Sequence, residues 1–552
     1  MFLDANDLPN DQQLSAHICI VGGGAAGLTI ALEFAGTDID VLLLESGGFA
    51  AEKDTQALYA GTVANEALHS PPDRYRQRRF GGTTTIWGGR CVPFDDIDFE
   101  PREYIPHSGW PLARALLMPY YARANRLCEA GAFAYTVRES FDSAVPPMIE
   151  GFESSHFTTD TLERFSCPTD FGVRYVHRLR AASNVRVLLH ANVTALQLNS
   201  AGTHTDELLV KTLRGKRFKV RAQQFVLAAG GLEVARLLLS SRDVHPGGIG
   251  NNHDVVGRYY MCHIAGTVGE LNIDRPLGAV WHGYDVSNEG IYCRRRLALR
   301  PDVQRSHAVG NFIARLHHPR ITNPEHRNAM LSLLYLAKFA IPYEYAKRLT
   351  GDERAGPGVW WRHLRNVLRR PFDALGFAAH LMRHRLLAER KFPSIIVKPR
   401  ANLFSIDFHA EQWPNQESRV SLSDEKDSLG MPKLLIDWRY SAGDVATVSR
   451  ALELLARDVR SSGIGRLDYD PASIELEMIR YGAYGGHHIG TARMGTDPHC
   501  SVVDANCMVH GIDNLHVAGS AVFPTSSQAN PTLTVVALAL RAAAHLATAL
   551  GP

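Results

Sequence analysis

The sequence predicts an α/β protein in two parts: a parallel sheet with helices on it, and an α+β part built on an antiparallel sheet. An apolar run at residues 18–21 leads into a glycine turn and a helical segment, which is typical of a buried parallel strand. The same strand–glycine–helix order recurs at residues 225–240. Within residues 263–480 the pattern changes to short alternating segments, such as 402–409 and 419–422, which favour antiparallel strands.

Size and composition narrow the function classes. The chain has 552 residues, 45% of them hydrophobic, which is enough for a large core and more than one domain. Its 59 Lys and Arg nearly balance 57 Asp and Glu, which argues against a nucleic-acid-binding protein. Eight scattered cysteines without a C-x-x-C pair indicate reduced thiols and a cytoplasmic location. Residues 1–17 lack the basic and apolar regions of a secretory signal, and no run of about 18 apolar residues suggests a membrane span.

The first apolar run begins a dinucleotide-binding pattern. The glycines of residues 22–27 follow G-x-G-x-x-G spacing, a helical segment follows at 28–34, and a second apolar run at 41–44 ends in Glu45. Glycines let the backbone approach a pyrophosphate, the helix N-terminus attracts its charge, and an acid in this place suits ribose hydroxyls. The pattern by itself does not separate FAD from NAD.

Residues 360–391 are basic and amphipathic, and Pro371 interrupts them. One interpretation is a solvated helix pair that covers the second part of the protein. The other is a surface that touches anionic lipid or a lipid-linked substrate. The first is favoured, because basic faces are usually just solvated.

Two adjacent histidines, His487 and His488, lie in the stretch GGHHIGTARMG. A neutral imidazole can take a proton near pH 7, so one of them could be a general base. The stretch could also be a metal site or a buried turn. A metal ranks below catalysis, because the pair lacks the i, i+4 spacing and acidic partner of a zinc helix.

Six motifs together resemble the glucose–methanol–choline (GMC) family of FAD-dependent oxidoreductases. They are GGGAAGL at 22–28, GGTTTIWGG at 81–89, SGWPL with PYY at 108–121, LAAGGLEVARLLL at 227–239, HHIGTARMG at 487–495 and NLHVAGSAVFPT with NPTLT at 514–534. The motifs stand in the family's order and span nearly the whole chain. The resemblance therefore implies FAD rather than NAD as the cofactor.

The family's fold also implies a domain organisation. A discontinuous, Rossmann-like FAD-binding domain would combine residues 1–262 with 481–552, and parts of 90–165 would pack on its neighbour. Residues 263–480 would form the substrate-binding domain, including a basic helical insertion at about 326–395.

The resemblance assigns the catalytic pair. The family has a histidine three residues before the glycine of a Gly-Thr pair, which here is His487. Its partner stands four residues before a threonine near the C-terminus, which here is Asn530. His487 would take the hydroxyl proton of an alcohol, Asn530 would hold the same oxygen, and hydride would pass to flavin N5. His488 would then be structural, and so would His263.

Asn530 also has an ordinary interpretation, since Asn followed by Pro531 is a common helix start, with Asn at the N-cap. Arg493 is expected to anchor its loop. The residues expected to bind FAD are Gly22, Gly24, Ala25, Ala26, Gly27, Glu45, Ser46, Gly82, Thr83, Thr84, Trp87, Gly88, Val193, Ala229, Gly230, Gly519, Ser520, Pro531 and Thr532. Some family members link FAD covalently through a histidine just before this tryptophan. Here Ile86 takes that place, so we expect non-covalent FAD.

The motifs look closest to the pyranose-oxidising branch and its bacterial relatives. This implies oxidation of a sugar or glycoside hydroxyl to a carbonyl. A lipidic or aromatic alcohol, which the basic helices would suit, is the alternative substrate. A non-catalytic FAD-binding scaffold is the alternative class. The electron acceptor, O2 or a quinone, stays open.

Overall fold

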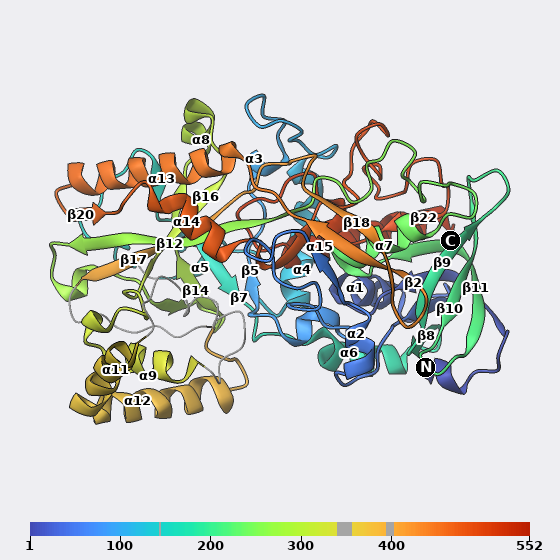
Figure 1. The fold of residues 1–552 in the computed structure, drawn as a ribbon, viewed down its shortest axis with the longest axis horizontal. Helices are drawn as coiled ribbons and strands as arrows, with labels where there is room; N and C mark the ends of the chain where they lie inside the picture. The colour runs from blue at the N-terminus through green and yellow to red at the C-terminus, as the bar shows by residue number, and fades with distance from the viewer. Residues whose placement is uncertain (143–144, 339–355, 394–401, 552) are drawn as a thin grey trace.

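The computed structural model describes residues 1–142, 145–338, 356–393 and 402–551. Figure 1 shows two parts side by side along the long axis, with both ends of the chain in the same part. Each part has its own cluster of buried hydrophobic side chains. The α/β fold class is confirmed, and the two parts differ in sheet type as the sequence predicts.

The part that holds both ends is built on an eight-stranded sheet. Its order is β1-β8-β3-β2-β11-β10-β9, and β22 pairs with β11. The pairs β1·β8, β8·β3, β3·β2, β2·β11 and β11·β22 are parallel, whereas β10 is antiparallel to both its neighbours. The strands are β1 Phe2–Asp4, β2 Gln13–Val21, β3 Val41–Leu44, β8 Val185–Leu189, β9 Asn192–Leu198, β10 Thr205–Lys211, β11 Arg217–Leu227 and β22 Leu515–Val517.

The turn between β2 and α1 (Ala25–Phe34) depends on glycine at two places. Gly22 has φ +109°, and a Cβ there would lie 2.7 Å from the carbonyl oxygen of Ala228, just after the neighbouring strand β11. A Cβ on Gly27 would lie 2.0 Å from the carbonyl oxygen of Gly22. Helix α1 can therefore sit directly on the end of β2 only because neither residue has a side chain.

The second part is built on a seven-stranded sheet of order β20-β12-β17-β16-β15-β6, with β21 paired to β12. All its pairings are antiparallel. Its strands are β6 Phe157–Thr158, β12 Met261–Ile273, β15 Leu297–Leu299, β16 Phe312–His317, β17 Leu403–Ala410, β20 Gly465–Asp468 and β21 Tyr484–Ile489. Helices α13 (Ala442–Ser461) and α14 (Ser473–Tyr481) lie on one side of it, and α9 (Ala329–Leu336), α11 (Pro357–Arg369) and α12 (Pro371–Leu381) on the other (Figure 1).

The alternating segment at 419–422 forms a strand but joins a different sheet from 402–409. It belongs to β18, which pairs with β19, and β19 pairs in turn with β4. Helix α7, after β11, packs on β18 and β19, so this small sheet borders the first part. These strands are β4 Gly61–Val63, β18 Arg419–Lys426 and β19 Pro432–Asp437; a further sheet holds β5 Arg90–Cys91, β7 Leu162–Phe165, β13 Tyr284–Val286 and β14 Tyr292–Arg295.

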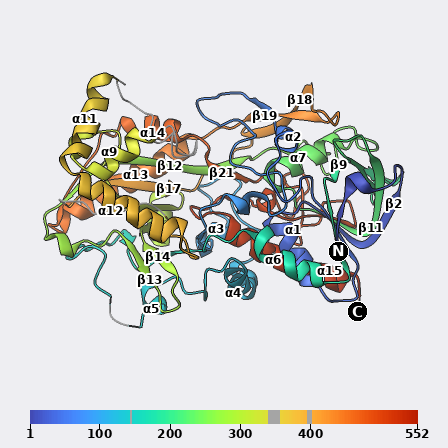
Figure 2. The same cartoon turned by 90° about the horizontal axis from the view of Figure 1, so that it is seen from below.

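The remaining helices connect and cover these sheets, as Figure 2 shows from below. They are α2 Lys53–Ala57, α3 Asp96–Phe99, α4 Met118–Leu127, α5 Val137–Ser140, α6 Phe171–Ala181, α7 Gly230–Ser240, α8 Pro301–His307 and α15 Thr532–Ala549. Short 3-10 turns are η1 Ala5–Asp7, η2 Gly82–Thr85, η3 Arg114–Leu117, η4 Leu277–Ala279, η5 Pro324–His326 and η8 Ser520–Val522, and η7 Met382–Leu386 is a π-helical turn.

Among the described residues, α15 is the helix whose length and apolar composition would allow it to cross a membrane. It packs against α1 and α4, and 56% of its 18 residues are buried in the fold. Core helices of soluble proteins have the same properties, so α15 is weak evidence for a membrane span.

Replacing Gly22 by alanine should destabilise the first part, because the new Cβ meets the Ala228 carbonyl and alanine is strained at φ +109°. The expected cost is about 1–3 kcal/mol, seen as a lower midpoint of thermal unfolding. Gly376→Ala in α12 is the matched control, because nothing lies within 4 Å of its Cβ position. The control should unfold at the wild-type midpoint or slightly above it. A wild-type midpoint for Gly22→Ala would contradict the steric account.

Candidate functional site

The two predicted catalytic side chains meet between the two parts of the molecule. His487 lies on β21, and Asn530 lies in the loop just before α15. The amide nitrogen Nδ2 of Asn530 is 3.2 Å from Nε2 of His487. On the other side of the same ring, Nδ1 of His487 is 2.8 Å from Nδ1 of His263 on the neighbouring strand β12. The three residues therefore form a continuous hydrogen-bonded row.

These contacts assign the proton positions in the row. The amide nitrogen of Asn530 can only donate, so Nε2 of His487 accepts and carries a lone pair. The proton of a neutral His487 then lies on Nδ1, and it is donated to Nδ1 of His263. His263 in turn carries its own proton on Nε2. The lone pair of His487 thus faces Asn530.

Burial keeps both rings neutral. It lowers the pKa of His487 well below the usual value, and the positive charge of Arg90, or of His263 when it is protonated, lowers this pKa further. Burial also lowers the pKa of His263 to about 4, although the nearby backbone of Ser526 and Ala529 opposes the shift. At neutral pH the row therefore contains two neutral imidazoles, and the Nε2 lone pair of His487 accepts from the amide of Asn530.

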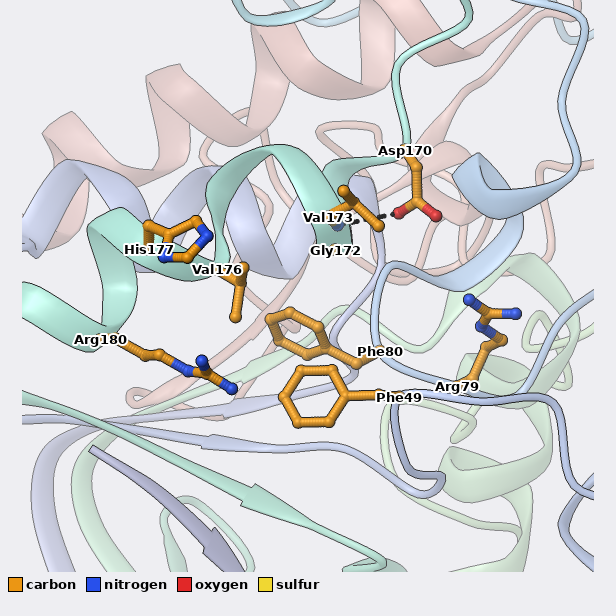
Figure 3. Close-up of a pocket in the computed structure, with 9 residues that line it drawn as sticks. All are labelled: Phe49, Arg79, Phe80, Asp170, Gly172, Val173, Val176, His177 and Arg180. Atoms are coloured by element: carbon orange, nitrogen blue, oxygen red, sulfur yellow. Dashed lines mark hydrogen bonds between the residues drawn. The ribbon is translucent and has the colours of Figure 1, made fainter.

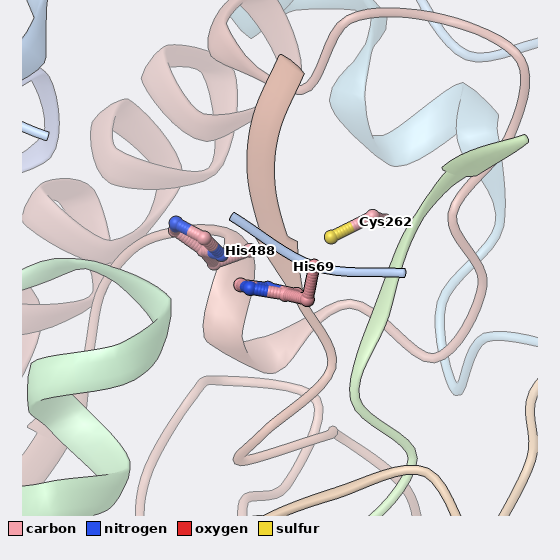
Figure 4. Close-up of side chains that lie close together, drawn as sticks. All are labelled: His69, Cys262 and His488. Atoms are coloured by element: carbon pink, nitrogen blue, oxygen red, sulfur yellow. The ribbon is translucent and has the colours of Figure 1, made fainter. Parts of the chain in front are cut away.

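His488 points away from His487 and makes structural hydrogen bonds, as the family resemblance implied. Its Nδ1 is 2.6 Å from the hydroxyl of Tyr260, and the same hydroxyl is 2.8 Å from Nε2 of His69 and 3.4 Å from Sγ of Cys262. The three side chains around this hydroxyl could also form a metal site, since their ligand atoms lie within 4.8 Å of one another (Figure 4). The phenol hydroxyl that bonds all three accounts for the cluster without an ion.

The predicted nucleotide residues gather at the end of the parallel sheet. The carboxylate of Glu45 accepts hydrogen bonds from the backbone N–H groups of Gly23 (2.7 Å) and Gly47 (2.9 Å). Burial raises the pKa of Glu45, against the hydrogen bonds from these amides. Ser46 donates to Asn192 at 2.9 Å, which places Val193 of β9 beside the end of β3.

The loop predicted to lie against a flavin packs directly on the glycine turn. The backbone N–H of Gly81 donates to the carbonyl of Gly23 at 2.8 Å, and a Cβ on Gly82 would lie 2.9 Å from the Cα of Gly24. Thr83 and Thr84 belong to η2, and Trp87 donates from Nε1 to the carbonyl of Thr169 at 2.9 Å, with Gly88 next to it. The loop is thus fixed from both ends.

The C-terminal tail closes the site. Ser520 follows Gly519, which has φ +134°, and donates from Oγ to the carbonyl of His488 at 2.7 Å. Ala229 and Gly230 start α7 close by, where a Cβ on Gly231 would lie 2.3 Å from the same carbonyl. The tail, α7 and β21 are therefore packed together at backbone distance.

One detail of the helix start at Asn530 differs from the sequence expectation. The cap residue of α15 is Pro531, the helix begins at Thr532, and no side chain caps it. Asn530 is not the N-cap, because its amide is turned to His487 instead. The first N–H groups of α15 therefore have no side-chain acceptor.

A pocket lies elsewhere, beside α6, and is lined by residues that include Phe49, Phe80, Asp170 and Arg180 (Figure 3). Asp170 also caps α6 by accepting from the N–H of Val173 at 3.1 Å. None of the residues predicted for catalysis or cofactor binding lines this pocket. The pocket borders the glycine turn and the loop at 81–89 through Phe80 and Asp170.

Comparison with known proteins identifies the family. A family profile described as FAD dependent oxidoreductase matches residues 17–333, which is more than half of the chain. The chain belongs to the FAD-dependent oxidoreductases. A second profile, described as GMC oxidoreductase, matches residues 414–539 of this FAD-dependent oxidoreductase, and the predicted GMC membership is confirmed.

Similar proteins match either nearly the whole chain at low identity or a short part of it at higher identity. The 6'''-hydroxyparomomycin C oxidase of Streptomyces lividus is 24% identical over 96% of this chain and 92% of its own. The C-glycoside 3-oxidase of Microbacterium trichothecenolyticum is 39% identical over 23% of this chain and 24% of its own. The crystal structure of pyridoxine 4-oxidase from Mesorbium loti matches with a TM-score of 0.51 and 20% identity, covering 96% of this chain and 99% of that one. The structural likeness shows a shared fold.

The residues at the site of this FAD-dependent oxidoreductase fit its cofactor. Gly24 caps α1 without a side-chain hydrogen bond, and Pro531 caps α15 without one. Two helix N-termini are thus free to face negative charge, one at the glycine turn and one beside His487. The close approaches at Gly22 and Gly27 leave the turn without side chains where a pyrophosphate would lie.

Two features of the site escaped the sequence analysis. His263 was expected to be structural, but it touches His487. Its only signal in the sequence is a polar residue inside an apolar strand.

Arg493 anchors its loop, as the sequence predicts. It donates to the carbonyl of His107 at 2.6 Å, and its guanidinium lies over the ring of Tyr259.

The second missed feature is a buried polar network that holds the loop before Asn530. The carbonyl of Asp98 on α3 accepts from Thr525 Oγ1 at 2.8 Å, and its carboxylate accepts from Ser527 Oγ at 2.6 Å. The carboxylate of Asp95 accepts from Gln528 at 3.3 Å. These contacts span more than 400 residues of sequence, so no local pattern could reveal them.

Stability should depend on pH through this network. Burial raises the pKa of Asp98 to about 7, and the charges of Asp95 and Glu411 act in the same direction. The folded state thus holds the proton more tightly than the unfolded chain, whose Asp pKa is about 3.9. The contribution of Asp98 to the free energy of unfolding is therefore fully present below about pH 4, and it is lost as the pH rises towards 7.

Asp98→Asn should remove this loss, so its unfolding midpoint should fall less than that of the wild type between pH 4.5 and 8. Thermal unfolding at several pH values measures the difference. Asp96→Asn, on the same short helix but with a mostly exposed side chain, is the control and should follow the wild type. The same pH slope in Asp98→Asn and wild type would refute the role of Asp98.

Proposed function

We propose that the protein oxidises an alcohol CH–OH group of a sugar or glycoside to a carbonyl, with His487 as the base and Asn530 as its partner. The observation that carries the proposal is the lone pair of His487 Nε2, held 3.2 Å from the amide nitrogen of Asn530. A substrate hydroxyl that replaces this direct contact would give its proton to the ring and accept a hydrogen bond from the amide. That is the pair of contacts an alcohol needs before it loses hydride.

His487 performs the proton step. Its neutral ring accepts the hydroxyl proton at Nε2, and its Nδ1–H stays bonded to His263, so the ring cannot rotate away from the substrate. Such general base catalysis contributes about 10²–10⁴-fold in rate. His263 contacts no substrate in this scheme and is a positioning residue.

Asn530 performs the orienting step. Its amide does not cap α15. It would donate a hydrogen bond to the substrate oxygen that loses the proton and so stabilise the negative charge that develops on that oxygen. The loop at 525–528 holds it in place through Asp95 and Asp98. Bound FAD supplies the acceptor for the hydride. The glycine turn at 22–27 and the N-terminus of α1 would hold its phosphates, and the free N-terminus of α15 would face its ring system.

The names of two relatives support a sugar or glycoside as the substrate: one is a C-glycoside 3-oxidase and the other a 6'''-hydroxyparomomycin C oxidase. A panel of sugars, glycosides and long-chain alcohols, added without oxygen, tests the proposal through loss of the flavin absorbance. Loss with sugars or glycosides supports it, loss only with long-chain alcohols favours the lipidic alternative, and no loss at all favours a scaffold. Air or a quinone added afterwards identifies the electron acceptor, which the sequence leaves open. The cytoplasmic location stays a prediction.

His487→Ala should keep FAD but lose most of its flavin reduction, by about 10²–10⁴-fold, because the proton acceptor is gone. Rapid-mixing absorbance at the flavin band measures the rate. Because the pKa of His487 lies well below 6.5, wild-type reduction should stay constant from alkaline pH down through 6.5. His499→Ala, at an exposed histidine, is the control and should reduce at the wild-type rate. Wild-type reduction in His487→Ala would refute its role.

FAD should be released when the protein is denatured in acid. Ile86 stands where some relatives carry the flavin-linking histidine, and its aliphatic side chain has no nitrogen to form the bond. The side chain is 52% exposed at the end of η2, beside the loop assigned to the flavin. After acid precipitation the pellet should be colourless and the supernatant yellow. A yellow pellet would show a covalent link.

A further inference from the structure

An exposed apolar surface lies on the helices of the basic segment, far from the candidate site. Among the described residues, eighteen large hydrophobic side chains are exposed, and eight of them fall within residues 357–387. Figures 1 and 2 show this segment, α11 followed by α12, at the end of the molecule opposite the parallel sheet. Isolated exposed hydrophobic residues are ordinary, but such a concentration marks a contact surface.

The exposed residues of α12 and η7 form a stripe along one helix face. Phe372, Leu375, Ala379, Met382 and Leu386 follow one another at spacings of three and four residues, and all are exposed. Phe372 is 83% exposed and Leu386 is 71% exposed. Residues at these spacings share one side of a helix, so the stripe is continuous. The buried residue of α12, Phe377, lies on the opposite side.

Helix α11 combines aromatic and basic side chains on its outer face. Trp361 and Leu368 are 60% and 63% exposed and lie two turns apart, with Arg365 between them. Within the part of the chain that the structure describes, Arg365, Arg369 and Arg383 are exposed and have no carboxylate partner. Residues 356–393 carry eight Arg and Lys against two acids, although the whole chain is nearly balanced.

The inner face of the same helices is firmly attached to the body. His363 of α11 is 3.0 Å from Ser332 Oγ on α9, and Asn366 donates to Ser332 and to the carbonyl of Pro324. At the far end, Arg390 donates to the carbonyls of Phe165 and Glu129. Helix α12, which carries most of the apolar stripe, packs on α9 and buries Phe377, so the stripe faces outward.

We propose that the outer face of α11, α12 and η7 docks on an anionic lipid membrane. The apolar stripe and Trp361 would enter the boundary between headgroups and acyl chains, where tryptophan is favoured, and the arginines would bind lipid phosphates. A second copy of the chain is a poorer occupant, because two such faces would bring the like-charged Arg365, Arg369 and Arg383 of each copy into contact. The proposal concerns where the enzyme works and does not depend on its substrate.

Vesicle flotation with the full-length, FAD-loaded protein tests this. Vesicles of phosphatidylcholine alone are compared with an equimolar mixture of phosphatidylcholine and phosphatidylserine. We expect the protein to float with the anionic vesicles and much less with the neutral ones, and high salt to weaken the binding. Phe372→Ser/Leu375→Ser and Arg365→Glu/Arg369→Glu should each lower the partition coefficient by about tenfold or more.

Matched controls keep the outcome clear. Leu277→Ser/Leu476→Ser removes two equally exposed leucines elsewhere and should float like the wild type. All variants should keep the wild-type unfolding midpoint and flavin content, since the changed side chains make no buried contact. Wild-type flotation of the Phe372→Ser/Leu375→Ser variant, or no binding to anionic vesicles at low salt, overturns the proposal. A wild-type dimer in light scattering that becomes monomeric in that variant also overturns it, because the face would then be an interface between copies.

Discussion

The parallel pairing of β22 with β11 is the contact on which the site depends. Leu515, His516 and Val517 add one more strand beside β11, which already pairs with β2, the strand that leads into the glycine turn. The N–H of Ala518 then donates to the carbonyl of Leu227, and the tail continues over α7 towards Asn530. The chain thus returns to this sheet after the 287 residues that separate β11 from β22. Without this strand, the turn that would hold the nucleotide and the residues that would perform the chemistry would not meet.

A second constraint is desolvation. The rings of His487 and His263 stay neutral because a charge on either ring would be buried away from water. Nδ1 of His487 donates the hydrogen bond, and Nδ1 of His263 accepts it. Nearby, burial would raise the pKa of Glu163, but Arg315 and Arg90 lower it to about 2. Charges in the neighbourhood are therefore paired, whereas the proton acceptor is kept uncharged. This is the arrangement a base requires, because a ring that is already protonated could accept nothing.

The two faces of β21 show how one strand serves both purposes. His487 faces Asn530 and His263, whereas His488 faces the Tyr260 hydroxyl and its carbonyl accepts from Ser520. The alternation of side chains along a strand makes this separation automatic. The second histidine thus fixes the strand that carries the first, with the cluster around Tyr260 as its anchor.

The sequence by itself determined the local chemistry of the chain. The glycine turn and the α/β class followed from residues close together in the sequence, because a left-handed φ such as that of Gly22 is a property of its own backbone. The FAD cofactor followed from the family motifs. The positions of His487 and Asn530 followed from family motifs, since nothing in either stretch alone distinguishes a base from a turn residue.

Only the tertiary structure decided what those residues touch. His263 contacts His487 although 224 residues separate them in the sequence, and Asp98 accepts from Ser527 over a separation of 429 residues. Strand β18 forms a sheet with β19 and β4 instead of joining the sheet of β17. The amide of Asn530 contacts His487 and does not cap α15. Such a hydrogen bond between distant segments depends on tertiary packing, which short-range sequence patterns do not encode.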